Sequence, residues 1–437
     1  MTRERHIVII GNGIAGITAA LSARNYTTAP ITLIGNAKGA TALSSALIDI
    51  APTPQNLPSK LETNVHALLK ANPLHPYHFS QRPVEAIISA VDLIIKNTRG
   101  LGFLPLSDLS PNILLPTEEG ALKETASAPN SLLSADLNAL SGGEVVVVGF
   151  ENTRYCRPNI VADALSRRLR DKPKLSFKPL LMKNIFRRFA DYAALPEVLA
   201  AHFDKSPTIA DDIITELRDY GQKKLWLFPP ILGIKRTKEF FERFRAELKS
   251  PLAEAIPVGS SVLAKRLLTA LTGALSENGI SHLPLKVTSV ETKEDSVTQI
   301  NTADGPVAST SVVLATGKFI GGGIIAAERP REEFFNLPLS FLDRTPDGGY
   351  EIRKIDKPLY AISESASHYR GYQPGLTAGV TVNSEFSPVD WEGRVVYKNL
   401  FAAGSILTAY SPVHHLCGMG TAIFSGYLAG RSAAKPQ

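Results

Sequence analysis

Cysteine is scarce in this sequence of 437 residues, which contains only Cys156 and Cys417, far apart in the chain. No C-x-x-C pair or cluster of histidines accompanies them. A disulfide framework, a zinc site and an iron–sulfur cluster each need more ligands at closer spacing. The composition therefore excludes these features for the chain itself, predicts no metal site, and is typical of a protein from a reducing cytoplasm.

Long apolar runs are also lacking. No uninterrupted stretch reaches the roughly 18 residues that suggest a transmembrane helix. Near the start, Arg3 and Arg5 precede an apolar stretch that imitates a signal peptide, but three glycines and Asn12 interrupt it. We therefore expect this segment to be part of the mature folded protein, and the chain to be cytoplasmic.

Positive charge is concentrated in one part of the chain, whose net charge is +6. Between Ala164 and Ala190, nine basic residues accompany one acidic residue. Two interpretations stay open: a solvated surface, or a docking site for an acidic protein, a membrane surface or a polyphosphate. No nucleic-acid-binding motif accompanies the charge, so we expect no nucleic-acid partner. The basic cluster consists of Arg167, Arg168, Arg170, Lys172, Lys174, Lys178, Lys183, Arg187 and Arg188.

What the sequence does have, at its start, is a strand pattern that runs into a glycine-rich turn, Gly11-Asn12-Gly13-Ile14-Ala15-Gly16. Gly11 permits the tight turn, Gly13 lets a pyrophosphate approach the backbone, and Gly16 lets helix and strand pack closely. The helix that follows would direct its free N–H groups, beginning at Ile14 and Ala15, toward the phosphate. A second strand is expected at residues 30–34. The alternative is a glycine-rich turn that only joins two elements.

Further along, the pattern predicts a buried strand at residues 144–150 and a helix at residues 237–249. Thr237 is the expected N-cap of that helix. Its aromatic stripe, which includes Phe240 and Phe244, is expected to pack in a core rather than to bind a cofactor.

Two more strand ends carry small residues and glycine, Ala315-Thr316-Gly317 and Ala402-Ala403-Gly404. The order and spacing of the three glycine-bearing strand ends resemble the two-dinucleotide-binding-domain flavoproteins. The resemblance implies that the first turn binds the cofactor phosphates and that the other two lie near the flavin. It also implies that the helix beginning near residue 418 points its N-terminus at the flavin, where it would stabilise negative charge.

Beyond these motifs, the chain resembles one family, the B-type subunits of anaerobic glycerol-3-phosphate dehydrogenase, described as FMN-dependent flavoproteins. Ala46 and Met419 stand where the family has glycines, and His414 and His415 do not match its pattern. The resemblance is clearest at residues 11–16, 43–49, 227–233, 314–329 and 411–420. It implies flavin contacts from Gly11, Gly13, Ile14, Ala15, Gly16, Ser44, Ser45, Thr316, Gly317, Gly404, Ser405, Gly418, Gly420 and Thr421.

Two positions depart from the pattern of the two-dinucleotide-binding-domain flavoproteins, and the first bears on the identity of the flavin. FAD proteins of this type carry an acid at the end of the second strand, but here Gly35-Asn36-Ala37-Lys38 follows that strand. In flavoproteins of this type an Asp also follows the glycine that corresponds to Gly404, and here Ser405 replaces it. Because the missing acid would bind the adenosine ribose, we expect FMN as the cofactor, with FAD bound through other groups as the alternative.

The resemblance implies an α/β fold, the Rossmann-type two-dinucleotide-binding-domain flavoprotein fold with an inserted α+β substrate or cap domain. We expect residues 1–50, 251–330 and 390–437 to form the discontinuous flavin-binding domain. Residues 51–250 are expected to form a mostly helical or mixed insertion, and residues 331–389 part of a second, cap domain.

The resemblance also implies a function, as a flavin-dependent subunit of a quinone-linked dehydrogenase that oxidises sn-glycerol 3-phosphate to dihydroxyacetone phosphate. Its partners would be an FAD-bearing catalytic subunit and an iron–sulfur subunit that anchors the complex to the inner face of the cytoplasmic membrane. Two alternatives stay open: a stand-alone FAD-dependent oxidoreductase of the fumarate reductase or aspartate oxidase type, and a scaffold subunit that has lost its flavin.

No catalytic residue stands out from the sequence. His414 and His415 are candidates for proton transfer, because histidine is the usual proton carrier near neutral pH. They could equally be a hydrogen-bonded structural pair before a helix. Arg329 could bind a phosphate group or lie on the surface.

Overall fold

The computed structural model describes residues 4–36, 39–151, 153, 157–186, 189, 194–221, 224–259, 261–345, 347–365 and 373–436. Lys38, Cys156, Arg187 and Arg188 lie outside the described residues.

The main sheet has five parallel strands, and its core strands are buried along their whole length. Such burial is typical of a parallel sheet covered on both faces. Within the registers, Ile10 pairs with both Ile34 and Leu314, so these strands end level with one another. The strand order is β19 (Leu400–Ala402), β13 (Ser311–Leu314), β1 (Ile7–Ile10), β2 (Ile31–Ile34) and β9 (Ser281–Leu283).

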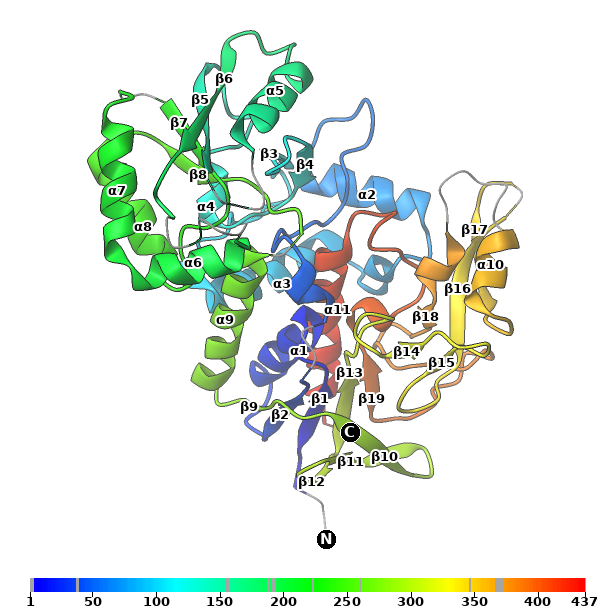
Figure 1. Ribbon diagram of the computed structural model, residues 1–437. Coiled ribbons are helices and arrows are strands. Elements are labelled where there is room, and N and C mark those ends of the chain that lie inside the picture. Colours follow the sequence, from blue (N-terminus) through cyan, green and yellow to red (C-terminus); the bar gives the residue numbers. More distant parts are fainter. Residues whose placement is uncertain are drawn as a thin grey trace.

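Two helices pack side by side against this sheet, α1 (Ile14–Arg24) and α11 (Gly418–Ala433) (Figure 1). They approach closely because α11 carries glycines where it meets α1. A Cβ on Gly426 would lie 2.4 Å from the Ala15 carbonyl oxygen, and one on Gly430 would lie 2.2 Å from that of Ala19. The last helix of the chain is thereby fixed against the first.

A second parallel sheet lies apart from the first, at the upper left of Figure 1. Its order is β6 (Leu175–Met182), β5 (Gly143–Phe150), β7 (Lys224–Phe228) and β8 (Leu252–Glu254). Two separate apolar cores pack against it. Its helices are α4 (Asn130–Leu133), α5 (Pro158–Arg168), α6 (Pro196–Lys205), α7 (Pro207–Arg218) and α8 (Thr237–Leu248).

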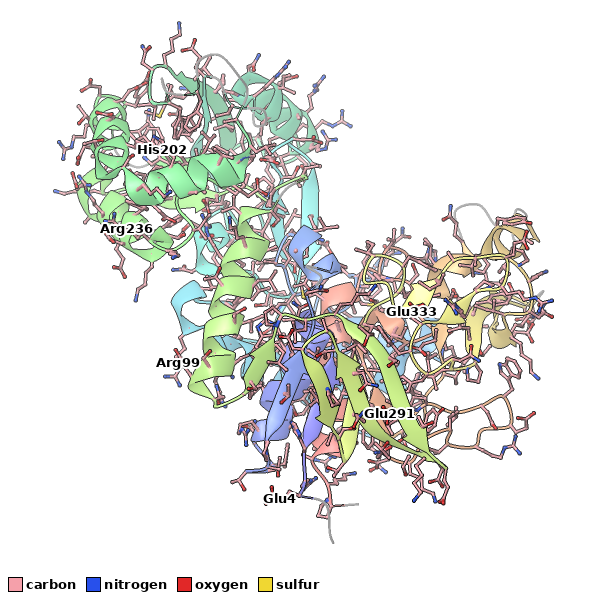
Figure 2. All side chains as sticks on the ribbon, turned by 60° about the horizontal axis from the view of Figure 1, so that its bottom comes forward. Glu4, Arg99, His202, Arg236, Glu291 and Glu333 are labelled. Carbon is pink, nitrogen blue, oxygen red and sulfur yellow. The ribbon has the colours of Figure 1, made fainter. Side chains whose placement is uncertain are left out.

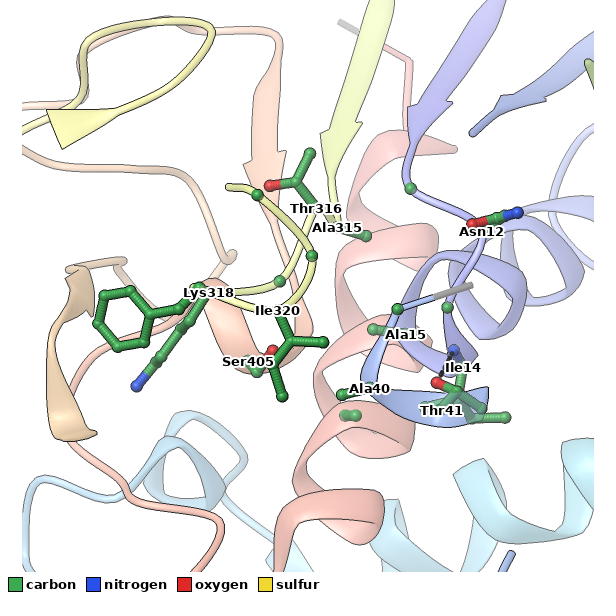
Figure 3. A pocket seen from close by; sticks show the side chains of 18 of the residues that line it. Asn12, Ile14, Ala15, Ala40, Thr41, Ala315, Thr316, Lys318, Ile320 and Ser405 are labelled. Carbon is green, nitrogen blue, oxygen red and sulfur yellow. Dashed lines mark hydrogen bonds between the residues drawn. The ribbon is translucent and has the colours of Figure 1, made fainter. Parts of the chain in front are cut away.

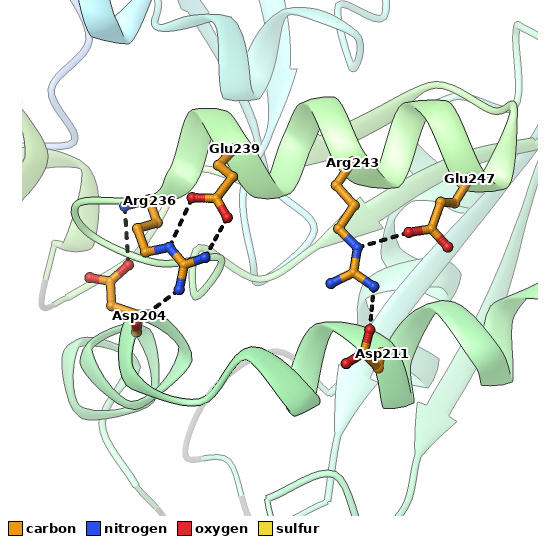
Figure 4. Close-up of polar contacts among 6 residues, drawn as sticks. All are labelled: Asp204, Asp211, Arg236, Glu239, Arg243 and Glu247. Carbon is orange, nitrogen blue, oxygen red and sulfur yellow. Dashed lines mark hydrogen bonds and ion pairs between the residues drawn. The ribbon is translucent and has the colours of Figure 1, made fainter.

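Polar contacts hold α8 against α6 and α7 (Figure 4). Arg243 bonds both Asp211 of α7 and Glu247, the latter at 2.8 Å. The carboxylate of Asp204 accepts the backbone N–H groups of Ile234, Lys235 and Arg236 at 2.9–3.2 Å. The expectation that Thr237 is the N-cap was wrong: Arg236 holds that position, and the Thr237 hydroxyl donates to the Gly233 carbonyl oxygen at 3.0 Å. Asp204, distant in sequence, binds the N–H groups of the segment that leads into the helix.

A buried ion pair joins the second sheet to α9 (Val262–Glu277), the helix that leads back toward the main sheet. Arg266 of α9 makes a two-pronged contact with Glu254 at the end of β8, at 2.5 and 2.9 Å. The same guanidinium donates to the Gly233 carbonyl oxygen at 2.8 Å, and Glu254 accepts the Leu232 N–H at 3.1 Å.

The remaining elements surround the main sheet. In the three-stranded sheet of β10 (Val287–Lys293), β11 and β12, Glu291 lies on β10 (Figure 2), where it accepts hydrogen bonds from the side-chain amides of Gln299 and Asn301. The strands are β3 (Ile113–Pro116), β4 (Leu122–Thr125), β10 (Val287–Lys293), β11 (Ser296–Thr302), β12 (Gly305–Ala308), β14 (Ile324–Ile325), β15 (Arg331–Glu332), β16 (Leu339–Arg344), β17 (Tyr350–Lys354) and β18 (Gly379–Val380). The α-helices are α2 (Leu61–Ala71), α3 (Pro83–Asn97) and α10 (Leu359–Ser365). The short 3-10 turns are η1 (Ala40–Leu43), η2 (Pro76–Phe79), η3 (Arg99–Leu101), η5 (Pro374–Thr377) and η6 (Gly404–Ile406).

Two kinds of feature are missing from the part of the chain that the structure describes. None of its helices combines the length and apolar character needed to cross a bilayer. Nor do its histidine, cysteine and acidic side chains gather into a group of three or more that could bind a metal ion.

Candidate functional site

A cavity of about 730 Å³ opens at the carboxyl edge of the main sheet. It lies there because β1, β2 and β13 end level with one another, so the loops that follow them converge. Ligands of open α/β sheets bind at this edge, and the volume is within the range of cofactor sites. Figure 3 shows Asn12 and Ile14 on one side of the cavity and Lys318 on the other, with Thr316 and Ser405 between them.

The glycine turn after β1 forms one wall of this cavity. Gly11 has a φ of +116°, and a Cβ there would lie 2.2 Å from the Ala315 carbonyl oxygen. A Cβ on Gly16 would lie 1.9 Å from the Gly11 carbonyl oxygen. Gly13 differs, since its φ of −76° suits any residue and the nearest atom to an added Cβ is Thr41 Oγ1, at 3.4 Å. Gly11 and Gly16 are therefore required by the fold, whereas a Cβ on Gly13 would make only an ordinary contact, at the wall of the cavity.

The start of α1 faces the cavity through Ile14 and Ala15. Its backbone N–H at Ile14 donates to Thr41 Oγ1 at 3.0 Å, the bond dashed in Figure 3. Thr41 comes from the short turn η1, which also brings Ser44 and Ser45 to the cavity. Hydroxyl groups and the positive end of a helix dipole together suit a phosphate.

The loop after β13 forms the opposite wall. Thr316 and Gly317 line the cavity. Ser405, which directly follows the third glycine-bearing strand end, and Gly418, at the start of α11, line it as well. The Thr316 hydroxyl is buried and has no hydrogen-bond partner among the described residues. Since buried polar groups in proteins are almost always paired, this hydroxyl is a fitting partner for a polar cofactor.

Four residues expected to contact the flavin lie behind the cavity wall instead: Gly16, Gly404, Gly420 and Thr421. The glycines serve close packing; a Cβ on Gly404 would lie 2.5 Å from the Ala15 Cβ, and one on Gly420 would lie 2.6 Å from the Asp49 carbonyl oxygen. The Thr421 hydroxyl is fully buried and donates to Cys417 Sγ at 3.3 Å.

The end of β2 lacks a carboxylate in the structure as in the sequence. Gly35 and Asn36 line the cavity there, and the Asn12 side-chain amide donates to the Gly35 carbonyl oxygen at 3.0 Å. The cavity continues past this point to Lys286 and Val287. It therefore has room beyond the glycine turn for the second half of a dinucleotide.

The three catalytic candidates do not line the cavity. Arg329 and His414 are exposed. His415 is buried, and its Nδ1 accepts the Ser411 N–H at 3.1 Å, so the neutral ring carries its proton on Nε2. Burial, with His414 and Lys318 nearby, lowers the pKa of His415 to about 4. His415 is therefore neutral near pH 7 and supports the Ser411 loop.

Three charged residues of this cavity, Asp49, Lys123 and Lys318, are not among those expected from the sequence. The Asp49 carboxylate pairs with Lys123 of β4 at 2.8 Å, and burial raises the pKa of Asp49. These two lie 74 positions apart, and no pattern in the sequence links them. Lys318 directly follows the Ala315-Thr316-Gly317 motif, so its place beside the cavity could have been inferred from the motif.

The parallel main sheet, its glycine turn and the cavity at its carboxyl edge have the arrangement of an α/β dinucleotide-binding fold. Residues 6–173 match the family model described as FAD binding domain, which confirms the expected fold class. The match supports a flavin cofactor and specifically FAD, and gives no support to FMN as the first choice.

Curated relatives of this chain are named as members of the family that its motifs resemble. The chain is 25% identical to the B-type subunit of anaerobic glycerol-3-phosphate dehydrogenase from Pasteurella multocida, over 97% of each chain. Its identity to the protein of that name from Yersinia pestis is 23%, over 96% of this chain and 95% of the other. The resemblance inferred from the motifs is thus confirmed. Among solved structures, E. coli quinol fumarate reductase covers 98% of this chain and 70% of its own, with 11% identity and a TM-score of 0.43.

Proposed function

We propose that this chain binds FAD in the cavity and is a flavin-dependent subunit of a glycerol-3-phosphate dehydrogenase. The observation that carries the proposal is the convergence of three glycine-bearing segments on one cavity, in a chain similar along its whole length to proteins of that name. FAD takes the place of FMN because the cavity extends from the glycine turn past Asn36 to Val287.

Different residues of the cavity would bind different parts of the cofactor. The start of α1, with Gly13 and the hydroxyls of Thr41, Ser44 and Ser45, would bind the phosphates. Asn36 and Lys286 would bind the adenosine half, in place of the missing carboxylate, and Thr316 would bond the other half. When bound, the flavin supplies the ability to accept two electrons from an alcohol and release them singly.

In the proposed complex, sn-glycerol 3-phosphate is oxidised to dihydroxyacetone phosphate and the electrons reach quinone through partner subunits. The relatives are named as one subunit of a larger enzyme, which supports the existence of partners. An iron–sulfur cluster needs about four cysteine ligands. The two cysteines here cannot supply them, so we assign the iron–sulfur relay and the membrane attachment to partners. We also propose an FAD-bearing catalytic subunit as a further partner of this chain.

Anaerobic reduction of the complex, isolated with its partner subunits, tests the proposal. We expect sn-glycerol 3-phosphate to bleach the visible flavin absorbance, and glycerol and succinate to leave it unchanged. Gly13→Val in this chain should stop electron transfer to quinone. Bleaching by succinate alone would overturn the proposal in favour of an enzyme of the fumarate reductase type.

A further inference from the structure

Lys318 is a buried cation at the end of the cavity remote from the glycine turn (Figure 3). The residue is buried, at 7% exposure. The ammonium group donates to the carbonyl oxygens of Leu376 at 3.1 Å and Tyr410 at 3.4 Å, and lies 5.3 Å from the centre of the Tyr410 ring. No carboxylate of the described residues forms an ion pair with Lys318. The acids of the cavity wall pair with other bases, Asp49 with Lys123 and Glu333 with Arg331.

A buried charge without a counter-charge is costly, because desolvation of the ion exceeds what two carbonyl dipoles return. Burial accordingly lowers the pKa of Lys318 to about 7, with no opposing contribution from an acid. A charge of this kind is stabilised when an anion enters the same low-dielectric space. The structure thus places a buried lysine, with no acidic partner among the described residues, in the wall of a cavity large enough for a ligand.

The surroundings of Lys318 suit a small oxyanion. Ser411 lines the same part of the cavity, and its backbone is held by His415. Phosphates of a cofactor would lie at the glycine turn, across the cavity, so an anion beside Lys318 would be a second one.

We propose that Lys318 anchors an oxyanion, a phosphate or carboxylate group, of a small substrate at the end of the cavity remote from the glycine turn. This rests on the proposed function in assigning the glycine-turn end to the cofactor. It adds that this chain has a substrate site of its own, in addition to any site on a catalytic partner. Lys318 acts as a binding residue that fixes the charged end of the substrate beside the flavin.

Anion titrations of the isolated holoprotein test the assignment, with inorganic phosphate and sn-glycerol 3-phosphate as probes and glycerol as the uncharged control. We expect both anions to bind and glycerol not to. Lys318→Met should raise the dissociation constants at least tenfold, and Lys318→Arg should restore most of the affinity. Lys398→Met, which removes an exposed lysine outside the cavity wall, is the matched control and should change nothing.

A pH titration of the unaltered protein tests the same claim without a variant. Sulfate keeps its charge at neutral and alkaline pH, and its affinity should fall toward tenfold per pH unit above the pKa of Lys318. The ionisable neighbours do not titrate at that pH: the pKa of His75, His414 and His415 is lowered, and that of Tyr410 and Cys417 is raised. Arg344 is the other charged group near His415.

The outcomes separate the inference from the proposed function. Anion affinity that is flat with pH, or unchanged in Lys318→Met with full flavin content, would overturn the assignment of Lys318. Loss of flavin from Lys318→Met with anion binding intact would also overturn it, because the lysine would then serve the cofactor. A flavin-free protein that still binds phosphate through Lys318 would support the subsite and refute the flavin assignment.

Discussion

Two glycines of the same turn have different physical roles, and this difference can be measured. A Cβ on Gly16 would collide with the backbone of Gly11 at 1.9 Å, whereas one on Gly13 would lie in ordinary contact with Thr41 at 3.4 Å. Gly13→Val should therefore fold with near-normal thermal stability and lose flavin, because its branched side chain occupies the space of the phosphate. Gly16→Ala should lose stability, by roughly 1–3 kcal/mol as for overpacked sites.

Flavin absorbance and thermal melts of the two purified variants distinguish these roles. Full flavin content in Gly13→Val would contradict the phosphate site at this turn. Equal loss of stability in both variants would show that Gly13, too, is needed for the fold.

Lys318 is a second single residue with a measurable effect, because it makes the free energy of unfolding depend on pH. Its pKa falls from 10.5 to about 7 on folding, so between these values the unfolded chain holds a proton that the folded protein has released. Stability therefore rises with pH across this window, by up to about 1.4 kcal/mol per pH unit. Between pH 7.5 and 9 the unfolding free energy of the ligand-free protein should gain roughly 1–2 kcal/mol relative to Lys318→Met. Parallel pH profiles from denaturant titrations would contradict this.

At the scale of elements, the ion pair between Glu254 of β8 and Arg266 of α9 is a sharp test of packing. Both side chains are almost fully buried, at 0% and 3% exposure. Glu254→Leu leaves a buried guanidinium without its partner, which costs about 3–5 kcal/mol. The double variant Glu254→Leu/Arg266→Met removes that unpaired charge, so it should be more stable than the single variant. Urea unfolding measures the stability of the two variants. A double variant less stable than Glu254→Leu would contradict this prediction.

Elements formed by local signals could be predicted from the sequence. The first strand, its glycine turn and α1 follow from apolar residues and glycines that lie next to one another in the chain. The N-cap of α8 could not be predicted, because Asp204 binds the N–H groups of the preceding segment from about thirty residues away. Local patterns specify where an element lies, whereas its end groups depend on contacts that only the fold creates.

The cavity shows the same limit at the scale of the whole molecule. Motifs indicated which strand ends converge, since parallel strands end at one edge of a sheet. Lys123 and Asp49 meet through a tertiary contact without a sequence signature, and Gly404 and Gly420 lie in close contact with Ala15 and Asp49 and outside the cavity lining. A glycine that touches a ligand and one that touches a backbone look alike in a sequence.

For the basic cluster, the two interpretations drawn from the sequence, a solvated surface and a docking site, can be separated by experiment. Among its described members, Arg167 and Arg168 lie at the end of α5, and Lys178 lies on β6, the edge strand of the second sheet. Some of its charges are paired, as with Arg167 and Asp163 at 2.6 Å and Lys178 and Glu144 at 2.5 Å. Arg168 and Arg170 belong to the same cluster, and Arg170 is exposed. If the cluster binds an acidic partner, added salt should weaken the association, because exposed charges are screened over about 8–10 Å.

Charge reversal tests this surface directly. Changing Arg167, Arg168 and Arg170 to Glu should release the chain from its complex while its flavin content stays intact. The control carries the same charge change at exposed lysines of other elements, with Lys60, Lys70 and Lys96 at the ends of α2 and α3 changed to Glu. Unchanged co-purification of the arginine variant would show that the cluster is only a solvated surface.

The central claim is that one cavity at the edge of the main sheet holds FAD, and the most direct test is to identify the released cofactor. Purified protein is denatured by heat, and the supernatant is resolved by chromatography with mass detection. We predict close to one FAD per chain in the unaltered protein and little in Gly13→Val. FMN in its place would contradict the proposed dinucleotide and restore the expectation drawn from the missing carboxylate. A chain that releases no flavin would contradict the account as a whole.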